Sequence, residues 1–388
     1  MLKPVDDTRM LGKFAHTLAG AGYRVAVAGQ ASAGAAAPAG VSLHPLFSGG
    51  RLSWARLRAQ LRYWRLLRAL QPALVVVHAP ELLPLTLLWQ QLGRGRQFIY
   101  DIRENYALNV STQGVYRGGV RRLLSAGLRW VEARAAGRAA ALTLAEASYA
   151  AELPFLPQLP AGRVLVLENK YQPAPGETLP AAPRPLPAST EPLRLLYSGT
   201  ISTLNGIEEA VALTWALHCL RPGGALLTLI GFVQQPGLLA ELARWQRQGL
   251  PLRVVGGTQV VPHAAIVAEI ERSHLGLALY QPHPSTWRCR PTKLFEYLAR
   301  GLPMLIPPNP LWEVLVLPPG AGLVFNQGTS PEATAQLLAA LTARATGAAP
   351  GFYPGGPVAG ALWASEGKKL RLLVETLLPS PTFTRPPA

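Results

Sequence analysis

The chain has 388 residues, 49% of them hydrophobic and 15% charged, so it can form two domains and is too apolar for an intrinsically disordered protein. Its formal net charge of +16 predicts an anionic partner, whether nucleic acid, an acidic lipid surface or a phosphorylated substrate. Only Cys219 and Cys289 are present, in no metal-ligand spacing, which excludes a disulfide framework and indicates a reducing compartment.

Residues 1–171 alternate short apolar runs with longer segments of helical spacing. Strands are predicted at residues 23–28, 73–77, 97–100 and 164–167. This alternation is typical of parallel βα units, so we expect residues 1–171 to form a Rossmann-like domain. A helix follows Pro4 with no strand before it, so the first strand is missing from the pattern, as in a truncated or mis-assigned start.

No export or membrane-spanning segment is expected. Residues 1–30 lack the basic start, the apolar stretch and the cleavage site of a signal peptide. The apolar tract at 73–93 is interrupted by His78, Glu81 and two prolines, which argues against a transmembrane helix. We therefore expect a cytoplasmic protein.

Two segments of the first domain are strongly basic. Residues 51–72 contain six arginines and no acid, with Trp and Leu residues at helical spacing, and residues 117–138 carry six arginines against Glu132 alone. Such helices can lie on an anionic membrane at the cell's inner face; alternatively, their apolar sides pack on the sheet and the arginines are solvated. Nucleic acid is not the expected partner, because no RRM, KH or zinc-finger signature is present.

A second α/β domain follows a proline-rich connector. Residues 172–191 form the predicted linker, since six prolines fall within 172–190. Residues 192–346 then resume the alternation, with strands expected at 193–199, 225–231, 252–257, 275–280 and 303–306 and helices at about 206–220 and 237–248. Residues 347–388 form a C-terminal segment whose amphipathic helix spans 358–378. We expect two Rossmann-like domains that face each other across a cleft.

The segment RPTKLFEYLARGLPML, residues 290–305, predicts a short helix with Thr292 as its cap and Gly301 at its end. Lys293 and Glu296 then lie in its first turn. A helix start favours phosphate, Lys293 adds charge, and the carboxylate of Glu296 can bind two ribose hydroxyls. The alternative is that Glu296 only pairs with Lys293 or Arg300 on a solvated surface.

This helix belongs to a wider set of motifs that resembles the family-4 retaining glycosyltransferases of the GT-B fold. LLYSGTISTLNGIEEAV (195–211) is similar to the family's loop beside the donor phosphates. VVVHAPELLPL and IYDIRENY resemble its two N-terminal cleft loops, and VLENKY resembles the turn before its linker. The resemblance implies a nucleotide-sugar donor bound mainly by the second domain, with Glu296 on the ribose, and an acceptor bound mainly by the first.

Several family positions carry other residues here. The Glu that contacts the donor sugar is replaced by Arg288, and the Arg and Lys that clamp the diphosphate are replaced by Thr200 and Asn205. Developing charge on the diphosphate still needs stabilisation, for which Lys293, Arg290 and Arg288 are available; a solvated surface cluster is the alternative. The predicted donor site comprises Gly199, Thr200, Asn205, Arg288, Arg290, Lys293 and Glu296.

The catalytic residues are less clearly marked. The family's His in the second cleft loop corresponds to Arg103, so its role cannot be transferred. Asp101 and Glu104 are weak candidates that could equally cap the next segment, and His78 could face the cleft or be structural. No Asp-x-Asp-like cluster appears at a strand end, so we expect no metal and no cofactor beyond the donor substrate.

These features predict a glycosyltransferase that moves a sugar from a nucleoside diphosphate to a lipid-linked or saccharide acceptor, in cell-surface polysaccharide synthesis. Two alternatives remain open. One is a catalytically inactive GT-B protein that binds a nucleotide-sugar or an anionic membrane, and the other is a basic nucleic-acid-binding protein.

Overall fold

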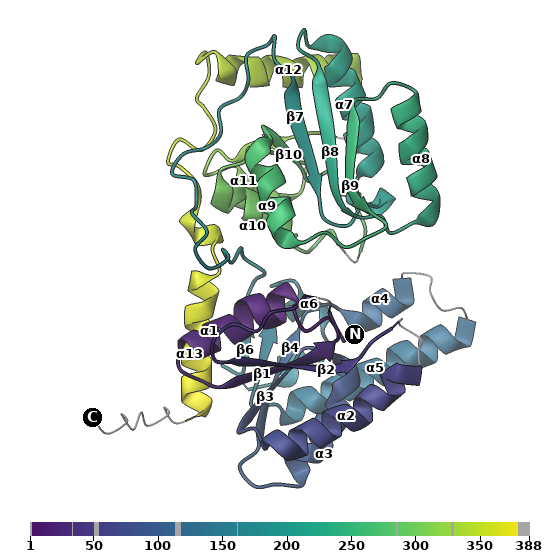
Figure 1. Ribbon diagram of the computed structural model, residues 1–388, viewed down its shortest axis with the longest axis vertical. Helices are drawn as coiled ribbons and strands as arrows, with labels where there is room; N and C mark the ends of the chain where they lie inside the picture. The colour runs from purple at the N-terminus through teal and green to yellow at the C-terminus, as the bar shows by residue number, and fades with distance from the viewer. Residues whose placement is uncertain are drawn as a thin grey trace. The chain divides into compact units, whose positions relative to one another are not determined.

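A computed structural model of the chain describes residues 2–32, 34–49, 54–112, 118–160, 162–284, 286–326 and 330–378. They form two compact units, each with parallel strands and helices (Figure 1). Unit 1 runs to Ala174 and includes the chain again from Trp363, and unit 2 is Pro175–Leu362. The α/β fold class with two parallel-sheet domains is confirmed. None of the described helices is both long and apolar enough to cross a bilayer.

Unit 1 contains a two-stranded and a four-stranded parallel sheet, in the orders β1-β2 and β3-β4-β5-β6. The strands are β1 (Val25–Gln30), β2 (Val41–Phe47), β3 (Leu74–Val77), β4 (Gln97–Ile102), β5 (Ala141–Leu144) and β6 (Val164–Val166). The helices are η1 (Thr8–Ala15), α1 (His16–Gly20), α2 (Trp54–Leu70), η2 (Pro80–Leu82), α3 (Leu83–Gln91), α4 (Tyr106–Thr112), α5 (Gly118–Arg138), α6 (Tyr149–Glu152), η3 (Leu156–Gln158) and α13 (Ala364–Leu377).

The terminal helix α13 packs on unit 1, although the sequence placed it in a separate C-terminal segment. Leu370 and Val374 of this helix share a buried cluster with Phe14 and Leu18, and Trp363 at its start donates its backbone N–H to the Tyr171 carbonyl at 2.7 Å. Apolar burial therefore returns the chain end to the first unit. Residues 379–388 of the predicted segment lie outside the described part of the chain.

The sequence pattern of unit 1 lacked a first strand. At that place the described residues form one isolated β-bridge. Pro4 forms an isolated parallel bridge with Gln30, through a 2.9 Å bond from Val5 N–H to the Gln30 carbonyl and a 2.8 Å bond from Gln30 N–H to the Lys3 carbonyl. The chain then enters η1, whose first N–H groups are capped by Asp7.

Unit 2 has one six-stranded parallel sheet in the order β12-β11-β10-β7-β8-β9. Its strands are β7 (Leu193–Ser198), β8 (Ala225–Phe232), β9 (Leu252–Gly257), β10 (Leu275–Leu277), β11 (Met304–Ile306) and β12 (Gly322–Val324). Its helices are η4 (Thr203–Asn205), α7 (Ile207–Leu220), α8 (Pro236–Arg247), α9 (His263–Arg272), α10 (Thr292–Arg300), α11 (Pro310–Val316), α12 (Pro331–Ala345) and η5 (Ala359–Ala361).

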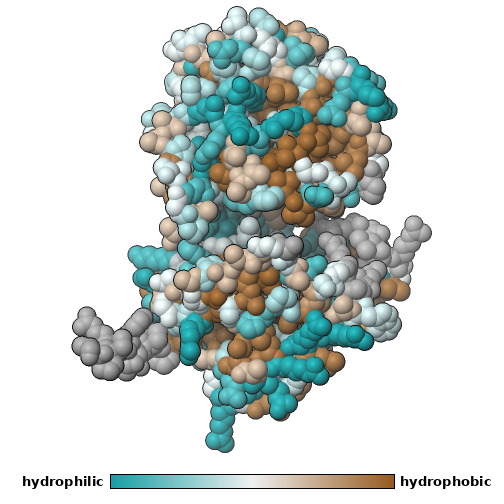
Figure 2. Space-filling view, in the orientation of Figure 1, coloured by the Kyte–Doolittle hydropathy of each residue, from teal (hydrophilic) through white to brown (hydrophobic). Residues whose placement is uncertain are grey.

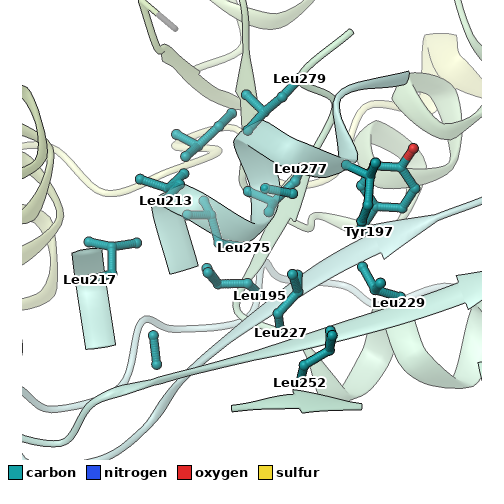
Figure 3. Packing of buried hydrophobic residues seen from close by; sticks show 14 of the residues in the cluster. Leu195, Tyr197, Leu213, Leu217, Leu227, Leu229, Leu252, Leu275, Leu277 and Leu279 are labelled. Carbon is teal, nitrogen blue, oxygen red and sulfur yellow. The ribbon is translucent and has the colours of Figure 1, made fainter. Parts of the chain in front are cut away.

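Leucines from the strands of unit 2 fill one continuous core. Leu195, Leu227 and Leu275 on neighbouring strands are fully buried and face Leu213 and Leu217 of α7 (Figure 3). Such strands are covered on both faces and are therefore almost entirely apolar. The packing fixes the carboxyl ends of β7 and β10 next to each other, because these two strands are hydrogen-bonded neighbours.

Candidate active site

The predicted donor-site residues converge at one point of the unit 2 sheet. From β7 the chain goes outward to β8 and β9 and then crosses back to β10 on the other side of β7. Ligands of open parallel sheets bind at such a reversal, beyond the carboxyl ends of the strands. The loop after β7 contains Gly199, Thr200 and Asn205, and the segment after β10 leads into α10 with Lys293 and Glu296.

The loop after β7 depends on two glycines with positive φ. Gly199 has φ 94°, and a Cβ added to it would lie 3.9 Å from Cε of Lys293. At Gly206, with φ 82°, a Cβ would lie 1.7 Å from the Leu279 carbonyl oxygen. Only glycine fits these positions, so the loop approaches both β10 and α10 closely.

Thr200 and Asn205, which stand where the family has cationic residues, hold this loop together. The side-chain amide of Asn205 donates to the Thr200 carbonyl at 2.9 Å, and the Asn205 backbone N–H donates to Ser202 Oγ at 3.3 Å. Thr200 itself is exposed. The amide of Asn205 is thus engaged with the backbone, which leaves the positive charge of the site to other residues.

Lys293 is a buried cation at the start of α10. Its side chain is 6% exposed, and its ammonium lies 4.5 Å from the Tyr197 ring centre and 5.1 Å from that of Tyr280. Within the described residues, Lys293 Nζ has no hydrogen-bond partner. Burial lowers the pKa of Lys293 to about 7, and Glu296 offsets only part of this effect.

The N-terminus of α10 is also open to a ligand. Pro291 is its N-cap, and among the described residues no side chain accepts a hydrogen bond from its first N–H groups, whereas Gly301, with φ 63°, ends the helix. The predicted cap Thr292 is instead the first helical residue. The unpaired N–H groups and the positive end of the helix dipole therefore lie next to the unpaired ammonium of Lys293.

Glu296 is held by a residue that the sequence did not mark. Its Oε1 lies 2.8 Å from Nε2 of His263, the first residue of α9, and Glu296 is 7% exposed. Arg300, the other predicted partner of Glu296, pairs with Glu177 and Glu271 instead. A lone histidine after β9 has no recognisable sequence pattern; only the sheet order brings it to α10.

Arg288 and Arg290 flank this site on the segment before α10. Arg288 is exposed and Arg290 is half-buried. The segment is anchored from α11, because Trp312 Nε1 donates to the Cys289 carbonyl at 2.7 Å and Asn309 Nδ2 donates to the Trp287 carbonyl at 2.9 Å. Both arginines therefore lie on a loop that hydrogen bonds from Trp312 and Asn309 hold in place, just before Lys293 in the chain.

In unit 1, Asp101 is completely buried at the end of β4. Arg9 donates to both carboxylate oxygens at 2.8 and 2.6 Å, Thr143 Oγ1 donates at 2.6 Å, and His78 Nδ1 lies 2.7 Å away. Burial raises the pKa of Asp101, but the charge and hydrogen bonds of Arg9, with those of His78, outweigh it and keep the pKa far below its usual range. This arrangement favours a positioning role for Asp101 over that of a proton acceptor.

Glu104 follows the end of the same strand by two residues and is partly exposed. It pairs with Lys3 at 3.2 Å and accepts from Asn109 Nδ2 at 3.1 Å. Burial raises the pKa of Glu104, but the charge and hydrogen bond of Lys3, together with the charge of Arg103 and of the chain's amino terminus, outweigh burial and keep the pKa below its ordinary value. Arg103, at the family's histidine position, pairs with Asp7 at 2.9 Å. The residues after β4 are thus linked by ion pairs to residues 3–9, a connection of some hundred positions in sequence.

Solved glycosyltransferase structures resemble the chain over most of its length. Sucrose-phosphate synthase from Thermosynechococcus elongatus has a TM-score of 0.58 and 16% identity, covering 95% of this chain and 88% of that one. WaaG, a glycosyltransferase involved in lipopolysaccharide biosynthesis, gives 0.57 and 16% over 94% and 90%. HepE from Anabaena, in complex with UDP-glucose, gives 0.57 and 13% over 86% of each chain. The fold is therefore that of the GT-B glycosyltransferases.

The amino-acid sequence also matches a known protein family over part of the chain. Residues 8–170 match the family model of the glycosyl transferase 4-like domain, which lies within unit 1. No curated protein sequence matches the chain significantly. The chain therefore contains a glycosyl transferase 4-like domain within a GT-B fold, and the resemblance found in its motifs is confirmed. In the described residues, no three His, Cys, Asp or Glu side chains converge as metal ligands.

Proposed function

We propose that this glycosyltransferase takes a sugar from a nucleoside diphosphate and transfers it, with retention, to a lipid-linked or saccharide acceptor in cell-surface polysaccharide synthesis. Lys293 carries the proposal: a buried ammonium costs free energy unless an anion pairs with it, and a diphosphate at the open end of α10 would do so. The substrate classes are supported by two similar proteins, since HepE forms a complex with UDP-glucose and WaaG is involved in lipopolysaccharide biosynthesis.

Each residue has a distinct role in this proposal. The N–H groups of α10 and the ammonium of Lys293 bind the diphosphate and stabilise its charge as the glycosyl bond breaks, with Arg288 and Arg290 closing over it. Glu296, oriented by His263, accepts hydrogen bonds from the ribose. Gly199 and Thr200 let the donor approach the loop backbone. The protein cations take the place of a metal, so transfer requires no metal or other cofactor.

The acceptor side belongs to unit 1 in this proposal. Glu104 is the better placed of the two carboxylates to meet a substrate, because its side chain is 39% exposed whereas that of Asp101 is enclosed. Asp101 acts through His78, whose ring it orients.

We further propose that unit 1 lies on an anionic membrane of the cytoplasmic leaflet through α2 and α5. On α2, Trp54, Leu57 and Leu61 are exposed and share the outer face with Arg58 and Arg65, while Ala59, Tyr63 and Leu67 face inward. The exposed apolar residues of α5 are Val120, Leu123, Leu124 and Trp130. Figure 2 shows apolar and hydrophilic residues intermixed on unit 1. Residues 51–53 and Arg117 lie outside the described ranges.

The exposed apolar and basic residues of α2 and α5 support contact with a membrane more than the alternative, in which the apolar sides of these helices pack on the sheet. The sequence left open whether Trp54, Leu57 and Leu61 cover the sheet, and their exposed fractions of 82%, 61% and 61% mean that they do not. Basic helices with exposed Trp and Leu bind the interface by apolar insertion and by attraction to anionic lipids. Acceptors carried on a lipid would then be delivered to the same surface.

A thermal-shift screen of UDP, GDP and ADP tests the donor site. One diphosphate is expected to stabilise the wild type by several degrees at saturating concentration, because it binds only the native state. In Lys293→Met its affinity should fall roughly 10- to 100-fold, the usual effect of losing a charge-assisted hydrogen bond. Arg247→Met, an exposed arginine at the end of α8, is the matched control and should bind like the wild type. Equal shifts in all three proteins would reject the role of Lys293.

Turnover separates the proposal from an inactive binding protein. Hydrolysis of the donor, or transfer to an acceptor extract, should be lost in Glu296→Ala and persist in the presence of EDTA. Stabilisation by a diphosphate sugar without any turnover would favour the non-catalytic alternative. Binding of oligonucleotides that is independent of Glu296 and falls steeply with salt would instead favour a nucleic-acid-binding protein.

A further inference from the structure

The turn that carries Arg288 is connected to the pocket of Lys293 by packed aromatic rings. The centre of the Trp287 ring lies 6.1 Å from that of Trp312, and the Trp312 ring lies 5.4 Å from the ring of Tyr280. The Tyr280 ring in turn lies 5.1 Å from the ammonium of Lys293. Since rings packed in this way keep a fixed arrangement, Arg288 has a defined place beside the buried cation.

The guanidinium of Arg288 has no other task in unit 2. It is exposed, and within the described residues it forms neither an ion pair nor a hydrogen bond. Its backbone is nevertheless held, because the Trp287 N–H donates to the His283 carbonyl at 2.9 Å and the Cys289 N–H donates to the Thr286 carbonyl at 3.0 Å. An arginine of this kind can bind a carboxylate or a phosphate through two parallel hydrogen bonds.

The diphosphate of the donor does not need all the positive charge at this site. An esterified diphosphate carries one negative charge on each phosphate, and Lys293, Arg290 and the N–H groups at the start of α10 can balance these charges. Arg288, which lies farther from α10 along the chain than Arg290, is then left with unused donors. The nucleobase and the ribose are uncharged, so the sugar is the part of the donor that can carry a further negative charge.

The same loops offer little to a neutral sugar. Residues 199–206 and 281–292, which meet at the start of α10, contain no Asp or Glu. Glu208 and Glu209 follow the first of these loops, and both already accept hydrogen bonds, Glu209 from Gln281 of the second. Sugar hydroxyls form their strongest hydrogen bonds with carboxylates, so these loops favour a donor sugar that brings its own negative charge.

We propose that the donor sugar carries a carboxylate, as a uronic acid does at C6, and that Arg288 binds this group through a bidentate pair. The inference rests on the proposed function, because it assigns the sugar of the same donor. Arg288 is then a specificity-determining residue. A neutral hexose has a CH2OH group at the same position and leaves the guanidinium without its anion.

Two matched pairs of donors test the proposal by titration calorimetry on the full chain. UDP-glucose is compared with UDP-glucuronic acid, and GDP-mannose with GDP-mannuronic acid, since the members of each pair differ only at C6. For the pair whose base the protein accepts, the wild type should bind the uronic acid roughly 10- to 100-fold more tightly, the usual effect of a charge-assisted hydrogen bond. A ratio of affinities near one in both pairs would overturn the proposal.

Substitutions then assign the preference to one side chain. Arg288→Gln should reduce the ratio to less than about threefold, and Arg288→Glu should bring it below one, because like charges repel. Arg247→Gln, at an exposed arginine of α8, is the matched control and should keep the wild-type ratio. If Arg288→Gln weakened both members of a pair equally, Arg288 would bind only the diphosphate, and the proposal would be wrong.

The variant Lys293→Met distinguishes failure of this proposal from failure of the donor site itself. It should weaken both members of a pair alike and leave their ratio unchanged, because Lys293 binds the part that they share. If UDP and GDP did not bind, or bound without any dependence on Lys293, the donor site and the acidic sugar would both be rejected. Binding that depends on Lys293 but shows no preference for a uronic acid would reject the acidic sugar alone.

Discussion

The two units of this protein hold the segments at their strand ends by different means. In unit 2, β7 lies inside a continuous leucine-rich sheet, and its loop meets α10 because β7 and β10 are hydrogen-bonded neighbours. In unit 1 the sheet is divided between β1 and β3, and its buried residues form two clusters that both contact Val25. Residues 3–9 are instead tied to the end of β4 by ion pairs.

Buried charged residues have opposite effects in the two units. The buried Arg9–Asp101 pair of unit 1 is fully satisfied, so it stabilises one arrangement and is costly to break. The buried Lys293 of unit 2 has no hydrogen-bond partner in the part of the chain that the structure describes, so it costs stability, and an anion would supply the partner. Removing a charge of the Arg9–Asp101 pair should therefore destabilise unit 1. Removing the charge of Lys293 should instead weaken the binding of an anion to unit 2.

The largest expected effect is that of Arg9→Met. It leaves the carboxylate of Asp101 buried without its ion pair, which costs about 3–5 kcal/mol. The thermal transition of unit 1 should fall by roughly 10 °C, at about 2–4 °C per kcal/mol for a domain of this size. Calorimetry, with hydrogen exchange to assign each transition to its unit, measures the change, and exchange in β7 and β8 should be unaltered.

Glu104→Gln is the matched control for that change. It removes the partner of Lys3 from a pair whose side chains are 35% and 39% exposed, and such pairs contribute about 0–1 kcal/mol. If Arg9→Met were no more destabilising than Glu104→Gln, buried charge would not be what holds residues 3–9 to β4, and the contrast between the units would fail.

A smaller effect is expected from the exposed apolar residues of unit 1. Trp54→Ser together with Trp130→Ser should weaken binding to vesicles that contain anionic lipid by about tenfold or more, since each exposed Trp contributes apolar area to insertion. Sedimentation with vesicles measures it, and thermal stability should not change. Val314→Ser, at an exposed residue of α11 in unit 2, is the control. Equal loss in the control would remove unit 1 as the membrane surface.

The sequence predicted the strands of unit 2 more completely than those of unit 1. Predicted strands at 225–231 and 252–257 correspond to β8 and β9, and β8, which lies inside the sheet, is a nearly continuous apolar run. β2 was missed, since Pro45 interrupts its pattern, which an edge strand tolerates. β5, with the sequence ALTL, has little β-branched character and was also missed.

The same limit applies to the candidate site. Lys293, Glu296 and Gly199 could be found because each lies within a local motif at a helix start or a strand end. His263 and Arg9 lie 33 and 92 residues from Glu296 and Asp101, the groups that they hold. No local pattern marks a single charged residue whose partner is that distant. Only the strand order of each sheet brings them together.

The pH dependence of the stability of unit 2 tests whether its buried Lys293 is unpaired, and its expected effect is the smallest of those considered. Lys293 has a pKa of about 7 in the folded chain and 10.5 as its ordinary value, so between these values the unfolded state holds the additional proton. Stability must then rise with pH, by at most about 1.4 kcal/mol per unit, relative to Lys293→Met, which has no proton to bind. At pH 6 Lys293→Met should be the more stable protein, and the difference should narrow from pH 7 to pH 9.

Donor binding should change in the opposite direction, because a diphosphate pairs with the protonated amine. Affinity should therefore fall by up to tenfold per unit above pH 7 in the wild type and remain nearly flat in Lys293→Met. Paired melting curves and titrations across this range measure both trends on the same proteins. Parallel pH profiles of the two proteins would show that Lys293 is already charged and paired in the free enzyme, and the unsatisfied cation of unit 2 would no longer distinguish it from unit 1.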